Sequence, residues 1–300
     1  MEKFLKVLYV GLANAGKTSI ILTLEKEYKK LSKLSPTLGI ERTSLDLMGA
    51  EAIIWDFGGQ DKFREKYLRD NRNFIDTDLI FYVIDIKDEE NYEESFKYYK
   101  KILKILKKYE EDPEIIVCIH KYDPDLDEAI YDEKYQELKK EFIDISKKEI
   151  KIFKTSIYNK KTLIEAFSYG VSKLLSDLNK IDLILLEFLD EQMLEGVLFF
   201  EKNSLIISEA YKDEGDKSFF LTVITNLIDL IEKSEKKRRL NELYLVLNRN
   251  LKLLLKHIII DKSDFFVVLI SKGESDIQEL WNLFLKNKYP KIEEIIKEKK

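Results

Sequence analysis

Residues 11–18, which read GLANAGKT, constrain the fold of this chain more than any other segment. They follow the pattern G-x-x-x-x-G-K-[ST], and they lie between an apolar run over residues 4–10 and a run with helical spacing that begins at Lys17. The chain has only 10 glycines in 300 residues, so two in one short loop mark a backbone with special requirements. A strand that enters a helix through such a loop favours a parallel α/β sheet.

Further apolar runs alternate with helical segments as far as residue 178. Continuous apolar runs are typical of strands that are buried on both faces. Strands are predicted over residues 4–10, 44–47, 52–55, 79–84, 115–119 and 152–153, and helices over residues 17–28, 92–109 and 163–178. This order predicts an α/β domain with a mostly parallel six-stranded sheet over residues 1–178.

The remainder of the chain, residues 179–300, follows a different order. Its predicted elements are a helix over 181–193, a hairpin of strands 197–200 and 204–208, a helix over 219–231, strands over 243–247, 253–260 and 265–270, and a terminal helix. Such an order predicts an α+β module with an antiparallel sheet. No low-complexity linker separates the two parts, so we expect two closely joined domains, 1–178 and 179–300.

Charge and cysteine content exclude several classes of protein. With 51 basic and 56 acidic side chains the net charge is −5, which argues against a nucleic-acid binder. Cys118 is the only cysteine, so an intramolecular disulfide is impossible and a cysteine zinc site is not expected. No apolar run approaches the ~18 residues of a membrane span, and neither end carries a signal-peptide or lipidation motif. We therefore expect a cytoplasmic protein with no membrane anchor of its own.

The segment 11–18 has the chemistry of a phosphate-binding loop. Small side chains let consecutive backbone N–H groups curl around phosphate oxygens, and the start of the following helix adds a favourable partial charge. Lys17 is expected to reach the β- and γ-phosphates of a nucleotide, and the Thr18 hydroxyl to bind Mg²⁺. The alternative, a chance glycine turn with a surface lysine, is disfavoured by the strand–loop–helix context. The predicted nucleotide-binding residues of this segment are Ala13, Asn14, Ala15, Gly16, Lys17, Thr18 and Ser19.

Residues 55–60, which read WDFGGQ, end the next predicted buried strand. A carboxylate at Asp56 is expected to hold Mg²⁺, and Gly59 to donate its N–H to a γ-phosphate. Gln60 is expected to orient the attacking water. Taken alone, an aspartate followed by glycines is often only a turn, but its combination with the phosphate-loop motif favours the functional interpretation.

The loop over residues 35–39 supplies a second metal ligand. Thr37 is expected to bind Mg²⁺ through its hydroxyl and the γ-phosphate through its N–H, so that the loop senses the third phosphate. Ser32 and Ser35 are alternatives for this role. The predicted metal ligands are thus Thr18, Thr37 and Asp56, and the predicted catalytic residues are Lys17, Thr37 and Gln60.

Residues 120–123, which read HKYD, follow the predicted buried strand 115–119 and supply a base-reading group. The Asp123 carboxylate can accept both N1–H and the exocyclic N2–H of guanine, a pair that adenine does not offer. Lys121 is expected to lie along the base and brace the phosphate loop, although a solvated Lys-x-Asp is common in isolation. After the sixth strand, backbone N–H groups are expected to close over the guanine. The predicted base-site residues are His120, Lys121, Asp123, Ser156 and Ile157.

Together these segments resemble a small GTPase of the Ras superfamily, and in detail its Rag/Gtr branch. The WDxGGQ form, His120 in front of Lys121, and the sequence TSIY over 155–158 carry this resemblance. Residues 198–201 (LFFE) and 205–208 (LIIS) are similar to the opening of the C-terminal roadblock (longin-like) module of that branch. The sequence PTLG at 36–39 is closer to the Arf pattern, so an Arf-like GTPase with an appended dimerisation domain is an alternative.

The resemblance implies a P-loop GTPase domain, 1–178, and a roadblock-like dimerisation domain, 179–300. It implies GTP or GDP with Mg²⁺ as cofactors, and a homodimer or a heterodimer with a related GTPase. Protein regulators of the activating and exchange-factor kind, effectors, and recruitment to a membrane by a scaffold are further implied partners. Hydrolysis is expected to be slow, because no arginine finger stands out and Arg42 lies beyond Thr37. The competing hypotheses are a non-catalytic, nucleotide-stabilised adaptor and an adenine-nucleotide P-loop enzyme.

Overall fold

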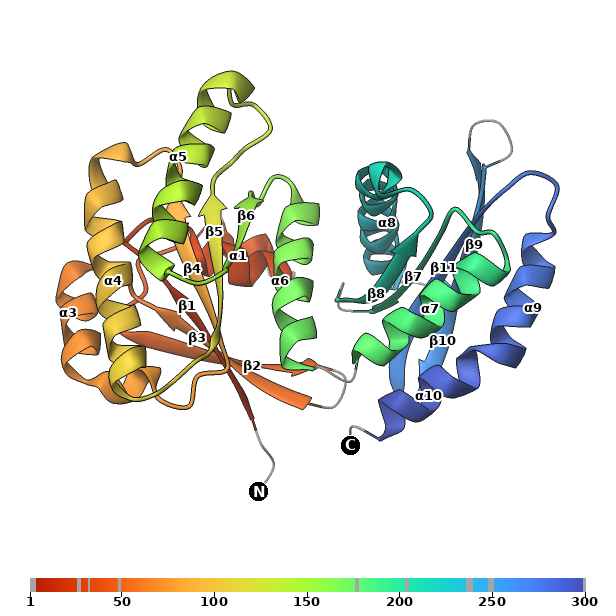
Figure 1. Ribbon diagram of the computed structural model, residues 1–300, viewed down its shortest axis with the longest axis horizontal. Coiled ribbons are helices and arrows are strands. Elements are labelled where there is room, and N and C mark those ends of the chain that lie inside the picture. Colours follow the sequence, from red (N-terminus) through yellow and green to blue (C-terminus); the bar gives the residue numbers. More distant parts are fainter. Residues whose placement is uncertain are drawn as a thin grey trace. The chain divides into compact units, whose positions relative to one another are not determined.

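The computed structural model describes residues 4–25, 28–31, 33–47, 50–175, 178–202, 205–235, 240–247 and 251–298. The chain divides into two compact units, Met1–Leu174 and Leu175–Lys300, called unit 1 and unit 2 below (Figure 1). This division falls four residues before the predicted domain boundary. Ser32, one alternative to Thr37, lies outside the described residues, as does residue 204 of the predicted hairpin.

Unit 1 contains a six-stranded sheet with the strand order β2-β3-β1-β4-β5-β6. The strands are β1 (Leu5–Val10), β2 (Ile40–Leu47), β3 (Ala50–Phe57), β4 (Leu79–Asp85), β5 (Glu114–His120) and β6 (Lys151–Thr155). Only the pairing of β2 with β3 is antiparallel, and the other four pairings are parallel. The predicted mostly parallel six-stranded sheet is confirmed.

Helices cover both faces of this sheet. They are α1 (Lys17–Leu24), α2 (Tyr28–Leu31), α3 (Asp61–Arg69), α4 (Tyr92–Lys108), α5 (Glu128–Ser146) and α6 (Lys160–Leu174), with short 3-10 helices η1 (Asn71–Phe74) and η2 (Glu89–Asn91). Figure 1 shows α3, α4 and α5 on one side of the sheet and α1 and α6 on the other. Helices α3 and α5 were not among the helices predicted from the sequence.

The parallel strands set the position of the candidate site. Their carboxyl ends meet at one edge of a sheet, so the loops that follow them also meet there. The ends of β1, β3, β5 and β6 lead into the phosphate-loop, WDFGGQ and base-site segments. Beneath them lies a dense core of aromatic side chains, in which Tyr82, Tyr99 and Phe142 contact one another.

Unit 2 contains a five-stranded antiparallel sheet with the order β8-β7-β11-β10-β9. The strands are β7 (Gly196–Glu201), β8 (Ile206–Tyr211), β9 (Glu242–Leu247), β10 (Leu251–Ile260) and β11 (Ser263–Lys272). The helices are α7 (Asn179–Glu191), α8 (Glu214–Glu235), α9 (Ile277–Asn287) and α10 (Tyr289–Lys297). The predicted α+β order is observed, except that the terminal helix is two helices, with Pro290 in the first turn of α10.

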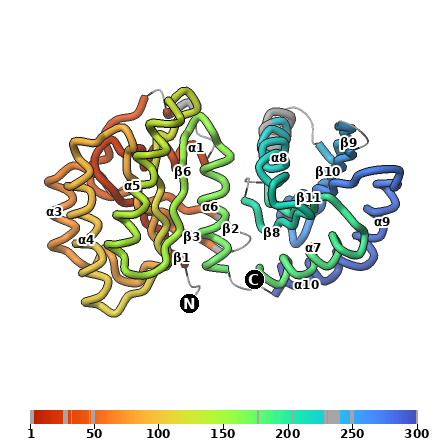
Figure 2. Tube along the Cα trace, turned by 45° about the horizontal axis from the view of Figure 1, so that its top comes forward, coloured from red at the N-terminus to blue at the C-terminus, as the bar shows by residue number. Residues whose placement is uncertain are grey.

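The helices of unit 2 lie on the two faces of its sheet. Helix α8 buries Phe220, Leu221, Ile224 and Leu227 against one face. Helices α7, α9 and α10 lie on the other side (Figures 1 and 2). Within the described ranges, no helix combines the length and the apolar composition that crossing a bilayer requires.

Candidate nucleotide-binding site

The loop between β1 and α1 forms one wall of a cavity of about 600 Å³. This volume is in the range of small-molecule sites. The loop turns into α1 at Gly16, whose φ is +95°, and a Cβ there would lie 2.4 Å from Cδ2 of His120. Only glycine therefore fits this position. The predicted residues that line the cavity are Ala13, Asn14, Gly16, Lys17, Thr18, Ser19, Thr37, Gly59, Gln60 and Lys121, whereas Ala15 is buried in the loop itself.

Lys17 places a buried ammonium under the phosphate loop. Its Nζ donates to the carbonyl oxygens of Gly11 at 3.1 Å and Leu12 at 2.7 Å. Burial lowers the pKa of Lys17 to about 8, although the nearby Asp56 carboxylate raises it. A polyanion bound beside this group would favour its charged form, so the position suits contact with phosphates.

Thr18, Thr37 and Asp56 come from three different segments and meet in one cluster. The Thr18 hydroxyl donates to Oδ2 of Asp56 at 2.5 Å, and the Thr37 hydroxyl donates to the same oxygen at 3.1 Å. The two hydroxyls are 3.0 Å apart. Oδ1 of Asp56 is buried and has no hydrogen-bond partner in the described part of the chain. An all-oxygen donor set with a free buried carboxylate oxygen fits Mg²⁺.

Besides the contact of Thr37 with Asp56, the Gly39 carbonyl group joins the loop that carries Thr37 to the WDFGGQ segment. The Gly39 carbonyl oxygen accepts from the Gly58 N–H at 2.8 Å and from the Tyr67 hydroxyl at 2.6 Å. A Cβ at Gly59 would lie 2.3 Å from the carbonyl oxygen of Leu12, so this glycine lets the segment pass directly over the phosphate loop. Gln60 follows in an extended conformation just before α3, and its side chain is not used as a helix cap.

His120 connects the base end of the site to the phosphate end. Its ring packs against Gly16, and its Nδ1 lies 3.0 Å from the Thr155 hydroxyl. The side chain is only 1% exposed, and this burial, together with the neighbouring Lys121 charge, lowers the pKa of His120 to about 4. The imidazole is therefore neutral at neutral pH, and it acts as a spacer between the two loops.

Replacing His120 with asparagine should make the folded state less sensitive to acid. The unfolded chain binds a proton at His120 near its ordinary pKa of 6.5, but the folded chain does so only near 4, so stability is lost as pH falls between these values. From pH 7 to pH 5 this loss amounts to about 2 kcal/mol. Urea unfolding of the wild type and His120→Asn at both pH values measures it. Equal losses in the two proteins would contradict the role of His120.

Asp123 is held by two side chains. Its Oδ1 accepts from the Ser156 hydroxyl at 2.6 Å, and its Oδ2 accepts from Lys87 Nζ at 2.7 Å. Burial alone would raise the pKa of Asp123, but the hydrogen bonds from Lys87 and Ser156 outweigh it and hold that pKa below its usual value. The Ser156 oxygen also accepts from the backbone N–H of Tyr158, and half-buried Ile157 lies between them.

Lys121 is paired with a residue that sequence analysis did not single out. Its Nζ donates to Oδ2 of Asp85 at 2.6 Å, and its backbone is left-handed with φ +60°. Asp85 is the last residue of β4, and Lys87 lies two residues beyond it. Their only sequence signal is a position at the end of a buried strand next to the one that leads to the base-site segment.

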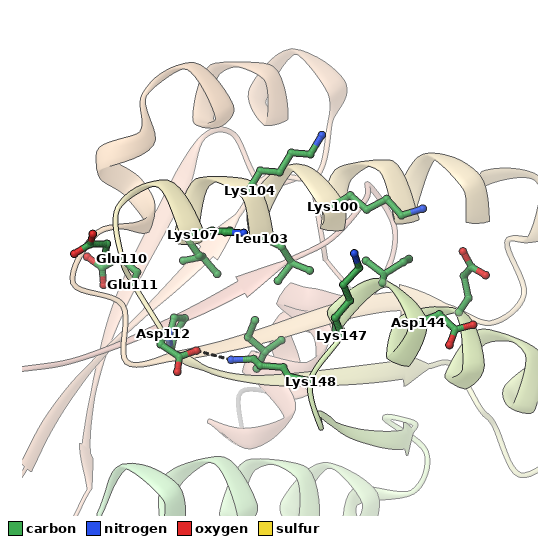
Figure 3. A pocket seen from close by; sticks show the side chains of 16 residues that line it. Lys100, Leu103, Lys104, Lys107, Glu110, Glu111, Asp112, Asp144, Lys147 and Lys148 are labelled. Atoms are coloured by element: carbon green, nitrogen blue, oxygen red, sulfur yellow. Dashed lines mark hydrogen bonds and ion pairs between the residues drawn. The ribbon is translucent and has the colours of Figure 1, made fainter.

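A second cavity, larger than the one above, lies away from these motifs, between the C-terminal ends of α4 and α5, and has a volume of about 950 Å³ (Figure 3). Its rim carries five lysines and five acidic side chains, of which Lys148 and Asp112 are paired at 2.5 Å. Opposite charges balance around it. Larger volume alone therefore does not make this groove the functional site.

The chain is similar to known proteins over most of its length. A model of the Gtr1/RagA G protein conserved region matches residues 6–231. The Ras-related GTP-binding protein A of Dictyostelium discoideum is 28% identical over 210 residues, 67% of this chain and 68% of that protein. The GTP-binding protein gtr1 of Schizosaccharomyces pombe is 27% identical over 217 residues, 70% of each chain. The solved Arl6 BBS3 small GTPase of Trypanosoma brucei aligns at 19% identity with a TM-score of 0.45, covering 57% of this chain and 96% of that one.

Proposed function

Because the chain belongs to the Gtr1/RagA G protein family and is a GTPase, we propose that it is a switch that binds GTP and GDP through unit 1 and hydrolyses GTP slowly. The observation that carries the proposal is the cluster of Thr18, Thr37 and Asp56 beside the buried Lys17 ammonium. Hydroxyls, a carboxylate and an ammonium on separate loops suit a nucleoside triphosphate and its metal ion.

Each group has a distinct task in this proposal. Lys17 holds the β- and γ-phosphates, and the backbone N–H groups of the phosphate loop surround them. Asp123 accepts the two guanine donors and so selects the base. Gln60 orients the water that attacks the γ-phosphorus in line with the leaving oxygen. Thr37 senses the γ-phosphate, and its loop changes contacts when that phosphate is gone.

Thr18, Thr37 and Asp56 are the residues that would hold Mg²⁺. The unpaired Oδ1 of Asp56 and the two hydroxyls that converge on Oδ2 support this assignment. When bound, the ion neutralises charge on the phosphate oxygens.

The contacts of two arginines support the proposal of slow unaided turnover. The Arg42 guanidinium lies 3.9 Å from the Trp55 ring centroid, over its face. The Arg64 side chain is 9% exposed and contacts Asp61 and Glu94. Both side chains are held by contacts with other protein groups, and an arginine at the transferred phosphate is worth ~10³–10⁵ in rate. We infer that an activating protein supplies this missing charge.

Single-turnover hydrolysis of GTP by the intact chain with Mg²⁺ tests the proposal. The expected rate is about 10⁻⁴–10⁻³ s⁻¹, as for an unaided small GTPase, with no tight binding of ATP. GTP binding without turnover would indicate a non-catalytic adaptor instead. Tight ATP binding would indicate an adenine-nucleotide enzyme.

Dimerisation through unit 2, with itself or with a related GTPase, is part of the proposal. The terminal strand β9 pairs with β10 on one side only in the sheet order, and Tyr244 and Val246 on it are 47% and 59% exposed. An edge strand with exposed apolar side chains is a template for pairing with another chain. The family match, which continues past unit 1 to residue 231, further supports a shared C-terminal module. Regulators, effectors and a scaffold that brings the protein to a membrane would act on such a dimer.

Light scattering after size exclusion measures this dimerisation. The intact wild type is expected to elute as a dimer at tens of micromolar, whereas Val246→Asp at the β9 edge should shift it to monomer because a charge is buried without a partner. Leu183→Asp on α7 removes a similarly exposed apolar side chain, 68% exposed, away from that edge, and should leave the dimer intact. Equal behaviour of the two variants would contradict an interface at β9.

A further inference from the structure

Two ion pairs join the end of β4 to the base-site segment after β5. Lys121 Nζ donates to Oδ2 of Asp85 at 2.6 Å, and Lys87 Nζ donates to Oδ2 of Asp123 at 2.7 Å. In each pair of residues, Asp85 with Lys87 and Lys121 with Asp123, the two are two positions apart. The signs are crossed: acid then base from the last residue of β4, base then acid after β5. We propose that Lys87 is a positioning residue that fixes the Asp123 carboxylate for guanine. This inference rests on the proposed function and deepens it.

The backbone brings these four side chains together. Asp85 pairs with His120 in the register of β4 and β5, and the next N–H, that of Ile86, donates to the His120 carbonyl oxygen at 3.0 Å. The pairing of the two strands thus continues one step beyond β4. Lys87 lies two residues past Asp85 and Asp123 three residues past His120, so their contact is made just beyond the last paired residues of two neighbouring strands.

Asp85 fixes both sides of this arrangement. Its Oδ1 accepts from the backbone N–H of Lys87 at 2.9 Å, while its Oδ2 accepts from the Lys121 ammonium. One carboxylate therefore sets where the Lys87 backbone lies and also ties down Lys121, whose left-handed φ of +60° needs support from its surroundings. The Lys87 side chain therefore extends from a backbone that Asp85 holds in place, and it is 37% exposed.

Lys87 and Ser156 orient the Asp123 carboxylate from opposite oxygens. Ser156 donates to Oδ1 at 2.6 Å and Lys87 to Oδ2 at 2.7 Å. Each carboxylate oxygen has two acceptor sites, so one site on each oxygen stays available for the two guanine donors. If the carboxylate rotated away from this orientation, it would lose one or both of the hydrogen bonds from Ser156 and Lys87. Lys87 therefore acts on guanine through Asp123, without a contact to the base.

The same contact keeps Asp123 ionised. Burial favours the neutral acid, and the groups that oppose it are Lys87 after β4 and Ser156 after β6, with His120 on its own segment. His120 has a pKa of about 4, so it is neutral through most of the working range. Without Lys87, the pKa of Asp123 should rise. A protonated Asp123 cannot accept both guanine donors.

The test measures GDP and IDP binding by the wild type, Lys87→Met and Lys87→Arg. IDP lacks the exocyclic amine of guanine, so its base can donate one hydrogen bond fewer to the Asp123 carboxylate. Its binding should therefore depend less on the orientation of that carboxylate. Lys87→Met should release GDP about five to ten times faster, since a charge-assisted hydrogen bond to a partly exposed lysine is lost. The preference of this variant for GDP over IDP should also be about threefold lower. As the pH falls, the variant should lose its affinity for GDP at a higher pH than the wild type does. Lys87→Arg should keep all three properties near those of the wild type.

A matched control is Lys97→Met, which removes a surface ion pair with Glu93 on α4, at 3.2 Å, and should change nothing. If Lys87→Met releases GDP at the wild-type rate, or more slowly because Lys87 competes with the base, the inference is wrong. Equal losses for GDP and IDP would show a merely structural role and also overturn it. If the wild type itself does not prefer GDP to ADP, the proposed function is wrong. This outcome differs from a failure of the Lys87 inference alone, in which the wild type prefers GDP but Lys87→Met behaves like it.

Discussion

Replacing Asp123 with asparagine is expected to weaken GDP binding by roughly 10³–10⁴-fold, because a site built on hydrogen bonds strongly rejects a mismatched partner. The asparagine amide presents an N–H₂ donor where the carboxylate has an acceptor, so at least one guanine donor meets another donor. The group is only 8% exposed, so water cannot restore the lost contact easily. Fluorescent GDP titration of the intact chain measures the loss.

Asp125→Asn is the matched control for this variant. Asp125 lies two positions further along the same loop and is exposed, so the same chemical change there should leave GDP affinity within about twofold of the wild type. The Asp123 variant should still fold, because asparagine can keep the contact with Ser156. A loss of less than tenfold for Asp123→Asn in a folded protein would mean that another group reads the base.

Gln60→Leu is expected to slow single-turnover GTP hydrolysis by at least about a hundredfold while GTP binds as before. The side chain lines the cavity next to Gly59 and makes no capping bond to α3, so its amide is available to a water molecule. Leucine has a similar size but cannot orient that water, and misplacing a reacting group costs about 10² in rate. Quenched-flow assays with radiolabelled GTP separate the chemical step from binding.

Gln136→Leu supplies the comparison for that experiment. Gln136 is exposed on α5 and belongs to no predicted site segment, so its replacement should leave both GTP affinity and hydrolysis unchanged. Full residual hydrolysis by Gln60→Leu would remove Gln60 from the catalytic assignment. A parallel loss of GTP affinity would instead mean that the variant disturbs the phosphate loop beneath Gly59.

The elements missed by sequence analysis share a physical cause. Helix α5 buries only Tyr135, Leu138 and Phe142 along its 19 residues, so its apolar stripe is too thin to stand out from its charged residues. Helix α3 has only nine residues and buries Arg64 and Tyr67, one of them a charged side chain, so its apolar face is too short to stand out in the sequence. Both helices are stabilised by tertiary packing more than by their own sequence pattern.

At the site, residues that belong to a motif could be predicted from the sequence, whereas contacts between side chains of different segments could not. The cluster of Thr18, Thr37 and Asp56 was predictable because each residue belongs to a segment with recognisable spacing. Lys87 was not, since it lies in a polar run that is typical of a solvated loop. Its contact with Asp123 depends on β4 and β5 being neighbours in the sheet, and the order of strands is not written in any one segment.

The Gly39 carbonyl accepts two hydrogen bonds, one from Gly58 and one from Tyr67. This single oxygen atom therefore links the two parts that are proposed to move in the switch, the loop that carries Thr37 and the segment that leads into α3. If Thr37 loses its contacts and the Gly39 carbonyl shifts with it, the segment before α3 loses the hydrogen bond from Gly58, and the last turn of α3 loses the one from Tyr67. We expect, as a result, that a protein bound to either segment is also sensitive to the conformation of the other. One small contact surface is then enough to distinguish the GTP-bound state from the GDP-bound state.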